Sequence, residues 1–219
     1  MGRGVRAFWE STIGKKIVMA VTGLVMVGFV IGHIAGNLLL FRGRAEINSY
    51  AAFLKDTGAL LWSVRAVLLV SVILHVVAAV QLTRRDLAAR PIGYRRKDPQ
   101  VSTFASRTIR WGGVLLLVFI VYHLLHFTTG TLHSSFSRED VYHNLVAAFS
   151  VWWVVAIYVV AMVALGLHLY HGGWAAVRTL GYSRPGENPL RHRIATVLAI
   201  AVWLGFTIVP LAVFAGLVR

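Results

Sequence analysis

The stretch IVMAVTGLVMVGFVIGHIAGNLLLF, residues 17–41, decides the fold. This apolar run of about 25 residues contains no lysine, arginine, aspartate or glutamate, and a helix of about 20 apolar residues is long enough to cross a bilayer. Four further apolar runs follow, at about 60–82, 111–129, 146–176 and 194–217. The sequence therefore predicts an all-α integral membrane protein, a single transmembrane domain over residues 1–219 with five helices in a bundle.

The composition supports a membrane protein and excludes several kinds of site. Hydrophobic residues make up 58% of the chain and charged residues 14%. The chain has no cysteine, which excludes disulfides, thiolate nucleophiles, cysteine-ligated iron–sulfur clusters and covalently attached c-type haem. A cleavable signal peptide is not expected, because the first apolar run is too long and no A-x-A site follows it.

The positive charge of the chain lies in loops and predicts its orientation. Of the 22 lysines and arginines, 16 lie before the first span, between residues 84 and 110, or between residues 178 and 193. These segments share one side of a five-helix topology, so we expect the N-terminus to be cytoplasmic and the C-terminus to be outside. No basic, aromatic-rich surface suited to nucleic acid is visible, so the net charge of +14 does not indicate a nucleic-acid partner.

Histidines are frequent inside the predicted spans. Six of the nine lie there, namely His33, His75, His123, His126, His168 and His171. Ionisable residues inside a membrane usually face the bundle interior and often mark a functional site. For any one of them, a neutral imidazole bonded to a neighbouring helix is a simpler interpretation.

Four of these histidines sort into two depths when distances are measured from the basic ends of the spans at 1.5 Å per residue. His33 and His123 lie roughly 24 and 18 Å in, whereas His75 and His168 lie roughly 13 and 15 Å in. We call His33 and His123 the outer pair, and His75 and His168 the inner pair. In an up-down bundle, the first and third helices can face each other, as can the second and fourth.

Each pair can therefore offer two imidazoles to one metal from opposite sides, which is what a six-coordinate haem b requires. Two haems at two levels would form an electron path across the bilayer. Small residues would leave room for them, and Gly28, Gly32 and Gly36 line one face of the first span. Close helix–helix packing explains the same glycines.

Sequence motifs carry a family resemblance over essentially the whole chain. The segments FWESTIGKK (8–16), VTGLVMVGFVIGH (21–33), RWGGVLLLVFIVYHLLHF (110–127) and GLHLYHGGWAAVRTLG (166–181) follow one another in a specific order and spacing. In these segments the chain resembles the five-helix, dihaem cytochrome b membrane-anchor subunit of succinate dehydrogenase or fumarate reductase (succinate:quinone oxidoreductase).

The resemblance implies a function and a set of partners. His33 and His123 match the axial ligands of a distal haem b, and His75 and His168 those of a proximal haem b. The anchor would receive electrons from an iron–sulfur subunit, which a flavoprotein subunit supplies in the tricarboxylic acid cycle, and would pass them to a quinone. The quinone type, menaquinone or ubiquinone, stays open. The complex would lie in the cell's inner (cytoplasmic) membrane.

Two histidines have less definite roles. His126 and His171 each lie three residues after a proposed ligand, on nearly the same helix face, so either is an alternative ligand. The resemblance favours His123 and His168. His171 and Arg178 lie nearer the cytoplasmic surface and are candidates to bind a haem propionate, as are Lys15 and Lys16, although positive residues are common on that side.

The quinone site is less defined. The resemblance implies a carboxylate near the outer side, and Glu46 in RAEINSY is the candidate for transferring protons to a quinone. An ordinary solvated glutamate is the alternative. Asn48, Tyr50 and Trp62 are weaker candidates, and Glu139 and Asp140 are expected to be surface residues.

Three other classes of membrane protein are alternative interpretations of these histidines. The HLLH (123–126) and HLYH (168–171) motifs suit a di-iron lipid hydroxylase or desaturase, but such enzymes gather histidines and carboxylates at one membrane face. A transporter or proton channel would use the same histidines and carry no chromophore. A dihaem cytochrome b of the bc type places two ligands on each of two helices, unlike the single depth per helix found here.

Overall fold

The computed structural model describes residues 2–89, 103–181 and 189–219, and within these ranges the chain forms helices and turns with no β-strand. Five segments are long and apolar enough to cross a membrane, and they are built on α2 (Thr12–Leu38), α4 (Ala59–Ala88), α5 (Phe104–His123), α7 (Trp152–Thr179) and α8 (Pro189–Phe214). The predicted all-α, five-helix membrane architecture is confirmed. The cytoplasmic N-terminus stays a prediction. Of the basic residues that carry it, Arg90, Arg95, Arg96, Lys97 and Arg184 lie outside the described residues.

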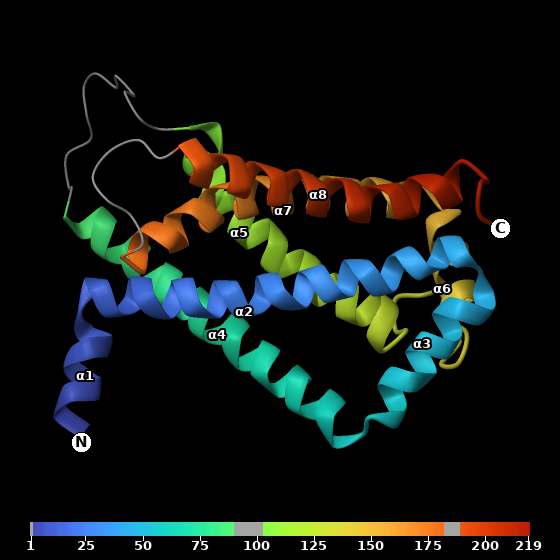
Figure 1. The fold of residues 1–219 in the computed structure, drawn as a ribbon, viewed down its shortest axis with the longest axis horizontal. Helices are drawn as coiled ribbons and strands as arrows, with labels where there is room; N and C mark the ends of the chain where they lie inside the picture. Colours follow the sequence, from blue (N-terminus) through green and yellow to red (C-terminus); the bar gives the residue numbers. More distant parts are fainter. Residues whose placement is uncertain (1, 90–102, 182–188) are drawn as a thin grey trace.

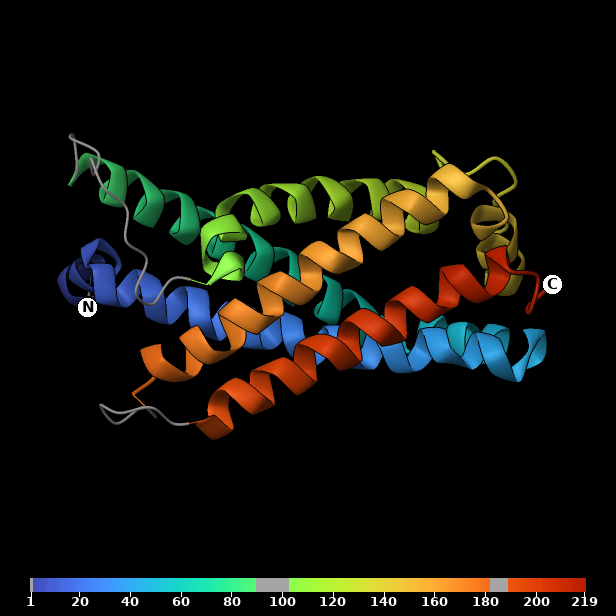
Figure 2. The ribbon, with the colours of Figure 1, turned by 90° about the horizontal axis from the view of Figure 1, so that it is seen from above.

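The spanning helices pack along one another in one bundle. α7 lies beside α8 and α5, while α2 lies beside α4 and also touches α7 and α8 (Figures 1 and 2). Many large apolar side chains point outward, for example Trp111, which is 80% exposed, and Val197, which is 67% exposed. An apolar outer surface of this extent suits contact with lipid, so the chain is a multi-pass membrane protein.

Five shorter elements were not predicted from the sequence. They are α1 (Gly2–Glu10), the 3₁₀ turn η1 (Leu39–Arg42), α3 (Arg44–Asp56), the π-helical segment η2 (Leu124–Thr128) and α6 (Val141–Phe149). α3 and α6 lie at the end of the bundle away from the N-terminus (Figure 1), which we call the outer end. The opposite end, where α2 begins, is the inner end.

α6 changes the predicted limits of the fourth span. Residues 146–149 are apolar and were expected to start that span, but they form the end of α6. Val151 then adopts an extended conformation, and α7 begins at Trp152. Asp140 starts the short helix, because its side chain accepts a hydrogen bond from the amide of His143. Hydropathy alone cannot show this break, since both helices are apolar.

A tight corner joins α1 to α2 at the inner end, and α1 lies across the direction of α2 (Figure 1). Ser11 Oγ donates to the Phe8 carbonyl and accepts from the Gly14 amide, each at 2.8 Å. Gly14 has no room for a side chain, because a Cβ would overlap the Phe8 carbonyl oxygen. The buried Lys15 donates to the carbonyl of Trp9 and lies 5.0 Å above its ring. Lys15, a sequence candidate for propionate binding, is thus engaged in the corner.

Candidate metal centres

The structure brings the four proposed ligands together in two pairs. The ring centroids of His33 and His123 lie 5.9 Å apart, with the ring planes at 83°. Those of His75 and His168 lie 6.1 Å apart, with the planes at 50°. A metal held between two imidazole nitrogens at about 2 Å each separates the ring centroids by roughly 6 to 6.5 Å. The inner pair lies within this range, and the outer pair lies just below it.

The pairs lie on the helices expected from depth, α2 with α5 and α4 with α7. They are also separated along the bundle axis. His168 lies ten residues beyond Tyr158 on α7, and Tyr158 is hydrogen-bonded to His123, so the two levels are about 15 Å apart. Within the described ranges, no group of three or more histidine, aspartate or glutamate side chains gathers around one position. Each centre therefore offers two protein ligands.

In the inner pair, hydrogen bonds fix which nitrogen of His75 is available. Its Nδ1 lies 3.0 Å from the carbonyl oxygen of Met19 and 3.3 Å from Thr22 Oγ1. A carbonyl only accepts, so Nδ1 carries the proton and donates it. Nε2 consequently keeps its lone pair. A metal-binding histidine is commonly in this state, with its other ring nitrogen donating a hydrogen bond to a carbonyl or carboxylate oxygen. Gly23 allows this approach, because a Cβ there would already lie 3.4 Å from Cε1 of His75.

The second inner ligand adjoins an apolar cavity. The cavity, of about 230 Å³, lies between α5 and α7 and is lined by Gly112, Leu115, Leu167 and His168 among others. Nδ1 of His168 is buried and has no partner among the described residues, a condition that costs about 1–3 kcal/mol. A buried polar atom beside an apolar cavity fits a site whose ligand engages His168.

In the outer pair, the hydroxyl of one tyrosine, Tyr158, lies within hydrogen-bond distance of two histidines. The Tyr158 hydroxyl lies 3.2 Å from Nδ1 of His123 and 3.1 Å from Nδ1 of His126. The ring contacts of His33 in the described chain are with Phe29, His123 and Phe206. The structure thus places His123, and not His126, beside His33. Sequence reasoning missed Tyr158, because a tyrosine in an apolar helix is usually a packing residue.

The π-helical segment η2 directly follows His123 and contains His126. Single π-turns inside α-helices are frequent at functional sites. The His126 ring stacks on Tyr122 at 5.2 Å and on His133 at 5.0 Å, facing the outer loop. The segment thereby continues the helix with His126 in a different environment from His123.

His171 and Arg178 lie toward the inner end of α7, beyond His168. Nδ1 of His171 and Nε1 of Trp174 are both buried without a partner among the described residues. Arg178 is exposed, and its guanidinium lies 6.0 Å from the centre of the Trp174 ring. The imidazole of His171 and the guanidinium of Arg178 can each donate a hydrogen bond to an anionic oxygen. Binding of a haem propionate by these two residues stays a prediction.

The glycines of the first span divide into two kinds. A Cβ at Gly28 or Gly32 would meet nothing within 4 Å, so these two leave open space beside α2. At Gly36 it would lie 2.6 Å from the ring of Tyr50. Gly36 therefore makes room for Tyr50 on α3, which explains that glycine by packing.

Two of the proposed quinone-site residues, Glu46 and Trp62, have exposed side chains. Glu46 is exposed in the first turn of α3, and none of the hydrogen bonds or ion pairs found in the described residues involves it. Trp62 is 67% exposed, with the Arg65 guanidinium 4.9 Å from its ring. Proton transfer by Glu46 stays a prediction that the geometry does not strengthen.

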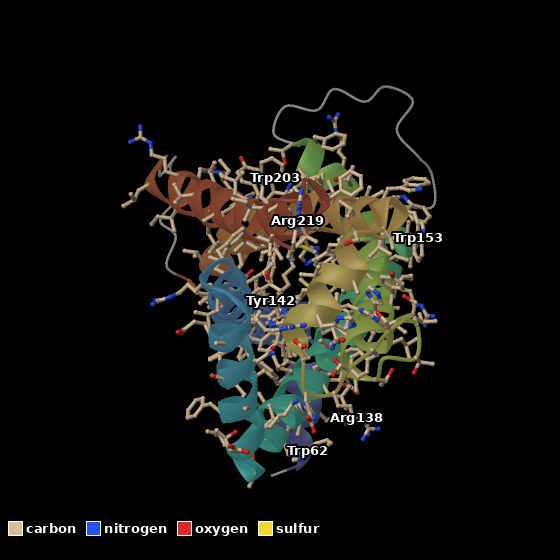
Figure 3. The ribbon with its side chains drawn as sticks, turned by 90° about the vertical axis from the view of Figure 1, so that its right-hand side faces the viewer. Trp62, Arg138, Tyr142, Trp153, Trp203 and Arg219 are labelled. Atoms are coloured by element: carbon tan, nitrogen blue, oxygen red, sulfur yellow. The ribbon has the colours of Figure 1, made fainter. Side chains whose placement is uncertain are left out.

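Asn48 instead forms a clamp between the two outer segments. Its amide nitrogen donates to Asp140 at 2.9 Å, and its amide oxygen accepts from the backbone of Tyr142 at 3.0 Å. Arg44 forms an ion pair with Asp140 at 2.9 Å, and the Tyr142 hydroxyl donates to the carbonyl of Arg219 at 2.8 Å. Figure 3 views this end of the molecule and labels Tyr142 and Arg219. Asp140 was expected to be an ordinary surface residue, but it connects α3 with α6.

This clamp predicts a pH-dependent contribution to stability. The amide of Asn48, the backbone amide of His143 and the Arg44 guanidinium hold the pKa of Asp140 below its usual value. A lowered folded-state pKa contributes stability that is present above the unfolded pKa of about 3.9 and is lost as the pH falls through the folded value. In thermal unfolding, Asp140→Asn should therefore melt lower than the native protein at about pH 6, and the difference should vanish in acid. A difference that does not change with pH would contradict this prediction.

The chain gave no match when it was compared with protein-family models, with curated proteins and with solved structures.

Proposed function

We propose that this chain is the dihaem cytochrome b membrane anchor of a succinate:quinone oxidoreductase. It would carry electrons from an iron–sulfur subunit through two haems b to a membrane quinone. The observation that carries the proposal is the presence of two histidine pairs, with ring centroids 5.9 and 6.1 Å apart, on different levels of one helix bundle. The sequence resemblance points to the same four residues independently.

The residues present fit a haem at each level. His75 and His168 would hold the inner haem, and His33 and His123 the outer one. Two imidazoles are available at each level, and a haem b would supply the remaining ligands of its own iron. The apolar cavity between α5 and α7, which His168 lines, can take part of a flat, apolar macrocycle. When bound, haem iron supplies a centre that accepts and releases one electron.

The protein's own contribution is to hold these ligands. The carbonyl of Met19 orients the His75 ring and keeps its Nδ1 protonated. Tyr158 contacts Nδ1 of His123 in the corresponding position of the outer pair.

The two ends of the bundle have different proposed partners. The inner end carries the basic segments and would lie on the cytoplasmic side, where the iron–sulfur subunit and the flavoprotein bind. There His171 and Arg178 would contact a haem propionate. At the outer end, a quinone would receive electrons, with Glu46 as the proposed proton donor. The membrane would be the cytoplasmic membrane of the cell.

The haem content of the purified full-length chain tests this proposal. A pyridine haemochrome assay together with a reduced-minus-oxidised spectrum should give two haems b per chain. In membranes that contain the whole complex, succinate should reduce haem. Purified chain without haem would contradict the proposal and favour a transporter. Non-haem iron bound in place of haem would favour a membrane di-iron enzyme.

A further inference from the structure

The hydroxyl of Tyr158 contacts two histidines of the same helix in nearly the same way. Its oxygen lies 3.2 Å from Nδ1 of His123 and 3.1 Å from Nδ1 of His126. A phenol has one proton to donate, and it also accepts. Both contacts can be hydrogen bonds if one histidine donates to the oxygen and the other accepts the phenolic proton.

The direction of the two bonds follows from the proposed ligand. His123 lies against His33, and it can bind a metal through Nε2 only if Nδ1 carries its proton. His123 then donates to Tyr158, and the buried phenolic proton finds an acceptor in Nδ1 of His126. This arrangement gives the two histidines opposite tautomers. We propose that Tyr158 is a positioning residue that orients His123 as the metal ligand and holds His126 by a hydrogen bond away from the metal. The inference rests on the proposed function.

Packing holds the Tyr158 ring in one place. The side chain is 6% exposed, and the rings of Phe119 and Phe149 meet it edge to face, each at 5.0 Å. A ring locked in this way keeps its hydroxyl in position without loss of further side-chain freedom. A residue that binds a metal directly, as proposed for His123, requires rigid support of this kind.

The far side of His126 is held as well. Its ring stacks at 5.0 Å on His133. Nδ1 of His133 accepts from the Ser135 amide at 3.2 Å, and Nε2 donates to the Asn144 carbonyl at 2.9 Å. His133 is thus held by Ser135 of its own loop and by Asn144 of α6. The contacts from Asn144 to His123 are continuous, so the outer loop supports the outer ligand through His126 and Tyr158.

The two levels therefore differ in how their ligands are supported. The inner ligand His75 donates to a backbone carbonyl, whereas the outer ligand His123 donates to a tyrosine hydroxyl. A side-chain acceptor can be removed by mutation. Loss of the acceptor makes the imidazole less basic, which destabilises ferric iron relative to ferrous iron and raises the reduction potential.

The test is a potentiometric titration of both haems in the complex that carries Tyr158→Phe. Two haems should remain bound, and the potential of the outer haem should rise. A tenfold change in the ratio of ferric to ferrous affinity corresponds to about 59 mV for this one-electron couple. The inner haem should keep its potential. Incorporation of 3-fluorotyrosine at position 158, which weakens the acceptor and preserves the packing, should shift the outer potential in the same direction by less.

Tyr122→Phe is the matched control. Its hydroxyl is also buried and lies in the same aromatic cluster, but it has no hydrogen-bond partner among the described residues. Its removal should leave both potentials unchanged. An unchanged outer potential in both Tyr158 variants would overturn the role of Tyr158, and so would an equal shift in Tyr122→Phe. The proposed function would still be supported if two haems were bound. Native protein without haem would overturn both.

Discussion

Under the proposed function, a His33→Ala variant should bind one haem b per chain and the native protein two. His33 supplies one of the two protein ligands of the outer pair, and alanine removes it completely. His75 and His168 lie about 15 Å away along the bundle, so the inner haem should stay bound with its spectrum and potential little changed. Haem content by pyridine haemochrome, followed by a redox titration of the remaining absorbance, measures both expectations.

His126→Ala is the control that separates the two candidate ligands on the third spanning helix. His126 contacts Tyr158 and stacks on His133, and it has no ring contact with His33 among the described residues. Its removal should leave two haems per chain. If His126→Ala loses the outer haem and His123→Ala keeps it, the ligand is His126 and the proposed pairing of His33 with His123 is wrong.

The depths of four histidines, counted from the basic ends of their spans, predicted which of them lie together. Gly23 precedes His33 by ten residues, and Gly113 precedes His123 by ten residues. In the structure, a Cβ at Gly23 would lie 3.4 Å from Cε1 of His75, and one at Gly113 would lie 3.9 Å from Cε1 of His168. Each helix of the outer pair thus carries, ten residues earlier, a glycine beside an inner histidine.

The parts that could not be predicted depend on contacts between distant segments. The distance along the chain from Asn48 to Asp140 gives no indication that their side chains bond, and hydropathy does not separate α6 from α7. Tyr158 looked like any aromatic residue of an apolar helix. Its role depends on α7 lying beside α5, together with the π-turn that follows His123. Neither the packing of α7 on α5 nor the π-turn can be derived from the periodicity or the composition of the sequence.

Gly23→Leu is expected to remove the inner haem without changing any ligand. A Cβ at this position already reaches van der Waals contact with the imidazole of His75. Helical side chains are largely restricted to two χ1 rotamers, so the leucine has little freedom to turn aside and its outer carbons must compete with that ring for space. His75 would then lose its hydrogen bond to the Met19 carbonyl and its place opposite His168. The measured result should be one haem per chain, with the outer potential retained.

Gly23→Ala distinguishes this steric effect from a simple need for glycine. The alanine Cβ fits at ordinary contact distance, and alanine is favoured over glycine inside a helix by about 1 kcal/mol. The alanine variant should therefore keep two haems and unfold at the same temperature as the native protein or higher. If both variants keep two haems at native potentials, Gly23 does not determine the position of His75. If both variants lose the inner haem, the loss comes from replacing glycine itself and not from the size of the new side chain. Only loss in the leucine variant alone places the imidazole of His75 against this face of α2, where the inner ligand must lie to meet His168.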